Sequence, residues 1–205
     1  MRAARLLLLA GTLFALVSPS CLAHAALQGA GDFYAGALHP LTSPEHMLPL
    51  LLIGLLAGQN GHRTMSFTLL VLPLSLAIGA AVSFGWPRLP GSFLGCMALA
   101  MLLGGLLALA WRLPRSAVGL LAAACGLIVG YANGSAISAD MQPVVFVAGL
   151  MAVGFLLQAY GMALVSALLA CQRGWLTIAI RVLGSWSVAI GLLVISLSHR
   201  ALLLA

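Results

Sequence analysis

A succession of long apolar runs, separated by short breaks rich in Gly, Pro and Arg, constrains this chain more than any single motif does. Each bilayer crossing takes about 20 apolar residues. Of the 205 residues, 63% are hydrophobic and only 6% are charged, whereas a soluble domain needs far more polar surface. The composition therefore predicts an all-α, polytopic helical membrane bundle with no separate soluble domain.

The first 25 residues have the pattern of a secretory signal peptide. Two arginines precede the apolar run 6–17, and the Ala-His-Ala sequence at 23–25 supplies the small residues that signal peptidase accepts. Cleavage there would leave residues 26–205 as a single transmembrane helical domain. The alternative is an uncleaved first membrane helix, which the short apolar run and Pro19 disfavour.

About six transmembrane spans are expected after the signal peptide. Their predicted bounds are 33–58, 65–84, 92–111, 116–134, 143–170 and 175–198. If the mature N-terminus starts outside the cytoplasm, the first, third and fifth breaks between spans face the cytoplasm. These breaks hold four arginines and the other two hold one, as the positive-inside rule requires. The chain is thus expected to be a multi-pass protein of the bacterial inner membrane.

The nine arginines stand singly or in pairs between the apolar runs, so lipid is the expected surrounding and no nucleic-acid partner is predicted. Three acidic residues are present, and no Ser-His-Asp, His-Glu-x-x-His or Gly-Lys phosphate-binding arrangement occurs. An enzyme is therefore not expected.

One stretch concentrates ionisable side chains at the start of the first span. It reads His39-Pro40-Leu41-Thr42-Ser43-Pro44-Glu45-His46. The two prolines prevent a plain helix, so a turn or broken helix is expected, and such segments form ion sites in transporters. Since imidazole and carboxylate groups bind divalent transition metals, His39, Glu45 and His46 are predicted to form a metal site open to the outside. A polar interfacial loop with incidental histidines is the alternative.

The spacing of the two histidines sets a geometric condition on such a site. On a continuous helix, seven residues correspond to about 10 Å along the axis. That is too far for both side chains to bind one ion, because imidazole nitrogens stand about 2 Å from such metals. The segment must therefore fold back, or the two histidines must act at successive positions along a path.

This stretch resembles the signature of the HupE/UreJ family of membrane proteins, in which a His-Pro-x-x-Gly-x-Asp-His motif precedes an apolar run ending near Gly-Leu-x-Ala. Here the motif is residues 39–46, and the run ends with Gly-Leu-Leu-Ala at 54–57. The resemblance extends along almost the whole mature chain, including the Arg-Leu-Pro break at 112–114. It implies a permease that takes up nickel or cobalt by secondary or facilitated transport and supports the maturation of hydrogenases or ureases.

The chain departs from the family pattern at several presumed ligands. Ser43 and Glu45 stand where the family prefers Gly and Asp. A second family motif, His-Gly-x-Ala-His-Gly, matches residues 129–134, where both histidines are replaced, and a further family histidine matches Gln158. Because amides offer a carbonyl oxygen, Asn133 and Gln158 are predicted to line the transport path as weak ligands.

Three functions therefore remain open. The first is a nickel or cobalt permease, with no cofactor other than the transported ion and with metalloenzyme maturation proteins as possible partners. The second is a permease for another small solute or cation that uses the same cavity. The third is a non-transporting membrane accessory protein that binds a partner or passes metal to one.

Overall fold

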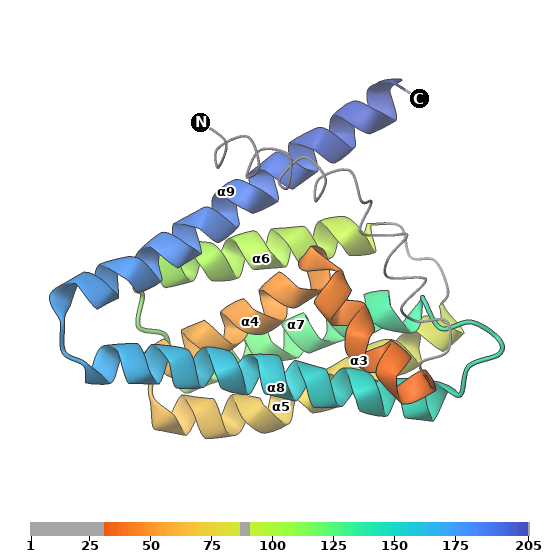
Figure 1. Cartoon of the computed structure of the whole chain (residues 1–205), viewed down its shortest axis with the longest axis horizontal. Coiled ribbons are helices and arrows are strands. Elements are labelled where there is room, and N and C mark those ends of the chain that lie inside the picture. The colour runs from red at the N-terminus through yellow and green to blue at the C-terminus, as the bar shows by residue number, and fades with distance from the viewer. Residues whose placement is uncertain (1–30, 87–90, 205) are drawn as a thin grey trace, which may run out of the picture.

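A computed structural model describes residues 31–86 and 91–204, and these residues form seven helices and no strand (Figure 1). The helices are α3 (Asp32–Thr42), α4 (Pro44–Gln59), α5 (His62–Gly85), α6 (Ser92–Ala108), α7 (Arg115–Gly134), α8 (Pro143–Ala170) and α9 (Gly174–Leu204). The prediction of an all-α fold is confirmed. The predicted signal peptide lies outside the described residues.

Each of the six predicted spans has a helical counterpart. Helices α5, α7, α8 and α9 are long and apolar enough to cross a bilayer, and α6, with 17 residues, is a shorter apolar helix. The first span is a bent pair, because the axes of α3 and α4 differ by 82°. The chain is therefore a multi-pass helical membrane protein whose first apolar segment is a bent helix pair, with the geometry of a broken span or a re-entrant loop.

Local chemistry explains the break at Ser43. Pro44 starts α4 and restricts Ser43 to an extended backbone, with φ −114° and ψ 102°. The Thr42 hydroxyl donates to the carbonyl oxygens of Leu38 and His39, at 3.2 and 3.1 Å, which satisfies the last turn of α3. The proline thus ends one helix and begins the next, as the sequence predicts.

Glycines set the pairing of the helices. A Cβ at Gly54 of α4 would collide with the carbonyl oxygen of Gln158 in α8. One turn further along both helices, a Cβ at Gly58 would stand 3.0 Å from the carbonyl oxygen of Met162. Because the contacts advance together, α4 and α8 run in the same direction. Such close backbone approach is how membrane helices associate without a hydrophobic driving force.

Helices α5 and α7 form a second parallel pair. Along α7, Gly126, Gly130 and Gly134 meet successive turns of α5 at Leu72, Leu76 and Ala80. Since α5 turns back beside α4 after the two-residue link 60–61, the two pairs run in opposite directions (Figure 1). This alternation agrees with the predicted order of spans.

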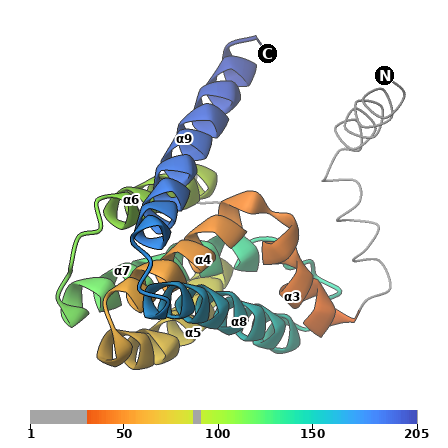
Figure 2. The ribbon, with the colours of Figure 1, turned by 60° about the vertical axis from the view of Figure 1, so that its left-hand side comes forward.

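Helix α9 stands apart from these four helices. It packs mainly on α6, where Gly184 approaches Gly104, and it projects away from the rest of the bundle (Figure 2). Within the most apolar 18-residue stretch of α9, only 22% is buried within the protein. The buried core therefore lies among α4 to α8, and α9 offers most of its surface to lipid.

Candidate metal and transport site

The break between α3 and α4 brings His39 and His46 together. Their ring centroids lie 5.6 Å apart, and the ring planes are inclined by 32°. A metal bound to a ring nitrogen stands about 3 Å from that ring's centroid, so centroids about 6 Å apart can share one ion. Of the two arrangements that the spacing allowed, the folded-back segment is the one present, and the two rings are close enough to reach a single ion.

Helix α8 supplies an aromatic neighbour to the pair. The ring of Phe146 in α8 lies 6.5 Å from that of His39, and His46 is only 7% exposed. The Nδ1 atom of His46 is buried and has no hydrogen-bond partner. Leaving a buried polar atom unpaired costs about 1–3 kcal/mol, so this nitrogen is available to a ligand.

Glu45 does not join the two imidazoles in this conformation. It is half-buried in the first turn of α4. Within residues 31–86 and 91–204, no three His, Cys, Asp or Glu side chains are grouped so that they could hold a metal ion. The structure thus assembles two of the three predicted ligands, and the role of Glu45 stays a prediction.

The two amides predicted to line the path are both fully buried. Asn133 donates from Nδ2 to the carbonyl oxygen of Val129 at 2.8 Å, but its Oδ1 atom has no partner. Gln158 has no partner for either its nitrogen or its oxygen. Both side chains therefore face the interior of the bundle, as expected for amides that avoid lipid.

A third buried amide, Gln59, was missed by sequence reasoning. It is 7% exposed at the end of α4, and its Oε1 atom has no partner. Its neighbour Asn60 has a structural task instead, because its Oδ1 accepts from the backbone nitrogen of Leu113 at 2.8 Å. The sequence signal for Gln59 was an amide at the end of an apolar run. It was read as part of the polar break that follows the first span.

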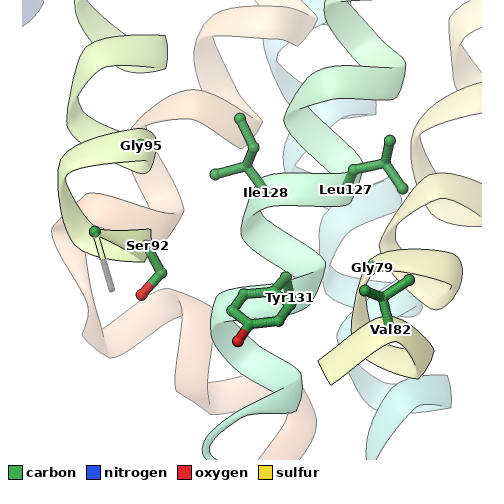
Figure 3. A pocket seen from close by; sticks show the side chains of 8 residues that line it. Gly79, Val82, Ser92, Gly95, Leu127, Ile128 and Tyr131 are labelled. Carbon is green, nitrogen blue, oxygen red and sulfur yellow. The ribbon is translucent and has the colours of Figure 1, made fainter. Parts of the chain in front are cut away.

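One pocket of about 440 Å³ lies away from the histidines, between α5, α6 and α7 (Figure 3). Its lining is Gly79, Val82, Gly91, Ser92, Gly95, Leu127, Ile128 and Tyr131. The Tyr131 hydroxyl donates to the carbonyl oxygen of Trp86 at 2.7 Å. The described residues of this mainly apolar lining include no imidazole or carboxylate, so they do not make a metal site.

The broken first span, the imidazole pair and the apolar helices define a polytopic membrane protein with a histidine-bearing discontinuous helix. The chain belongs to the HupE/UreJ family, since the family model described as "HupE / UreJ protein" matches residues 12–194. It is also similar to "Protein HupE" of Rhizobium leguminosarum bv. viciae, with 26% identity over 156 residues. That alignment covers 76% of this chain and 81% of the relative. No solved structure matches.

Proposed function

We propose that this protein is an inner-membrane permease for a divalent transition metal, nickel or cobalt, with its mature N-terminus outside the cytoplasm. The observation that carries the proposal is the pair His39 and His46, whose rings lie 5.6 Å apart across a broken helix within an apolar bundle. Neutral imidazole suits both metals. Membership of the HupE/UreJ family supports the same conclusion.

The imidazole pair is the proposed entry site, and Glu45 contributes negative charge beside it. A divalent cation would bind His46 through the unpartnered Nδ1 and would be shared with His39. Because His46 is buried, an ion bound there would exchange part of its water for imidazole nitrogen, which offsets the cost of its lost hydration. Transport without an ATP-binding sequence would be facilitated or driven by a gradient, and the delivered ion would serve the maturation of hydrogenase or urease.

The interior amides extend the proposed path beyond the entry site. Asn133 and Gln158 are fully buried and retain unpartnered oxygens. An amide oxygen is a weaker ligand than imidazole toward late transition metals. Weak ligands inside the bundle would allow an ion to leave the entry site and continue, since a path of uniformly strong ligands would hold it.

Uptake of radiolabelled nickel and cobalt should be measured in liposomes that contain the purified protein. We expect saturable uptake at least tenfold above protein-free liposomes, with no comparable uptake of magnesium, because Mg²⁺ prefers oxygen ligands to imidazole. Uptake equal to that of protein-free liposomes, from protein that is folded and correctly inserted, would exclude a permease. Co-purification of a maturation protein in that case would favour the accessory function.

Restoring histidines in the interior provides a second prediction. The triple variant Val129→His, Asn133→His and Gln158→His should raise nickel uptake at low nickel concentration about threefold, because imidazoles replace weak amide ligands. The control is Leu120→His, which adds a histidine to the exposed face of α7 at a residue that is 72% exposed. An unchanged rate in a folded triple variant would show that these positions do not line the path.

A further inference from the structure

Four residues from four helices meet at one level of the bundle. A Cβ at Gly154 of α8 would collide with the terminal methyl Cδ1 of Leu76 in α5, and it would lie 4.0 Å from Cδ2 of Leu50 in α4. Gly130 of α7 packs on the backbone of the same Leu76. Both leucines are completely buried. These contacts define an apolar layer made of Leu50, Leu76, Gly130 and Gly154.

Unpartnered polar groups lie on both sides of this layer. His46 is four residues before Leu50 on α4, and Asn133 is three residues after Gly130 on α7. Because α4 and α7 run in opposite directions, both residues lie one turn, about 5 Å, to the same side. Helix α8 runs parallel to α4, so Gln158, four residues after Gly154, lies one turn to the other side. The leucines therefore lie between the unpartnered atoms of His46 and Asn133 on one side and those of Gln158 on the other.

An apolar layer of this kind opposes the passage of ions. A cation at this level would meet the methyl groups of Leu50 and Leu76 beside Gly154. Hydrophobic constrictions in membrane proteins stop conduction by excluding water. The closest contact across the layer involves the end of a flexible leucine side chain over a glycine. Side chains in packed cores do change rotamer, so a rotamer change at Leu76 would open this contact while the glycine-packed helix pairs stay together.

We propose that Leu50 and Leu76, closing over Gly154, form a gate that separates the outer His39–His46 site from Gln158. The proposal rests on the proposed transport function, and it assigns a task to residues that carry no metal-binding chemistry. In this structure the two leucines are completely buried, and Cδ1 of Leu76 fills the space beside Gly154, which corresponds to the closed state of the proposed gate. Gln158 itself is also fully buried.

Solvent access to Gln158 tests the gate without any transported metal. Gln158→Cys is placed in a chain whose four native cysteines are alanine, and a small cationic thiol reagent is added from the histidine side of the membrane. With Leu76 intact, we expect slow labelling. With Leu76→Ala, labelling should be at least tenfold faster, because the methyl groups that close the layer are gone. The matched control is Leu103→Ala, which truncates an equally buried leucine in α6.

Nickel uptake is then measured in the native-cysteine protein with the same leucine variants. Leu76→Ala should raise the uptake rate at least threefold, and the volume-conserving Leu76→Met should stay near the wild-type rate. If Leu76→Ala fails to fold, Leu76→Val removes a single methylene and should give smaller increases in both labelling and uptake.

The two measurements distinguish failure of the gate from failure of the transport function. Equal labelling rates in the Leu76→Ala and Leu103→Ala proteins would overturn the gate, even if the wild-type protein carries nickel. Faster labelling in the Leu76→Ala protein alone would establish the closed layer, and absence of nickel uptake in the wild type would then overturn only the permease function.

Discussion

Replacing either His39 or His46 by alanine should reduce nickel uptake by at least tenfold. The two rings lie 5.6 Å apart and are proposed to share one ion, so the loss of either removes half of the imidazole ligands. The double variant should lose little more than each single variant, because the effects of residues that act as one unit are not additive. Initial rates of radiolabelled nickel uptake in liposomes measure all three variants.

His62→Ala is the matched control for these variants. His62 is exposed at the start of α5, and its replacement should leave the uptake rate within twofold of the wild type. Glu45→Gln, which keeps the shape and removes the charge, should lower uptake less than either histidine variant does. Wild-type uptake in the double alanine variant, at normal abundance in the membrane, would refute the site and favour a non-transporting accessory protein.

Gly54→Ala should be among the most destabilising single-methyl additions in this chain. The added Cβ would collide with the carbonyl oxygen of Gln158, and backbone cannot move aside as a side-chain end can. Overpacking of this kind costs about 3 kcal/mol, so we expect a marked fall in the thermal unfolding temperature in detergent. Nickel uptake should also fall, since the α4–α8 contact positions both His46 and Gln158.

Gly105→Ala provides the control for that substitution. Gly105 also lies inside an apolar helix, but a Cβ there would meet no atom within 4 Å. Its unfolding temperature should match that of the wild type or slightly exceed it, because alanine is the better helix former. Equal unfolding temperatures for the Gly54 and Gly105 variants would contradict the close approach of α4 to α8.

The sequence was sufficient for the order of helices and for the break in the first span. Hydropathy alone marks the runs, and Pro44 marks the break, whereas Pro40 is accommodated inside α3. What the sequence could not supply was the angle of the break, because packing on α8 sets it. The local pattern allowed either a folded-back segment or two histidines that act at successive positions. The bend of 82° places the two imidazole rings next to each other.

Partners that are distant in sequence limited the prediction of the site. The burial of Asn133 and Gln158 followed from the cost of exposing an amide to lipid. Among the described residues Glu45 does not form a three-residue group with the two imidazoles, and this depends on the packing of α4 against helices that are distant in sequence. The sequence does not distinguish Leu50 and Leu76 from other leucines in the spans. Their convergence is visible only in the structure, where both approach Gly154 of α8.

The reliance of α3 and α4 on α8 has a consequence for the order of assembly in the membrane. The carboxylate of Asp32 accepts from the backbone nitrogen of Gln142, 110 positions later, and Gly36 packs against the backbone of Phe146. During synthesis the N-terminal part emerges first. Helices α3 and α4 are therefore made before α8, and three more helices follow them before α8 can pack against His39 and His46. The proposed entry site would thus be completed late, and a chain that ends before α8 would lack the helix against which α3 and α4 pack.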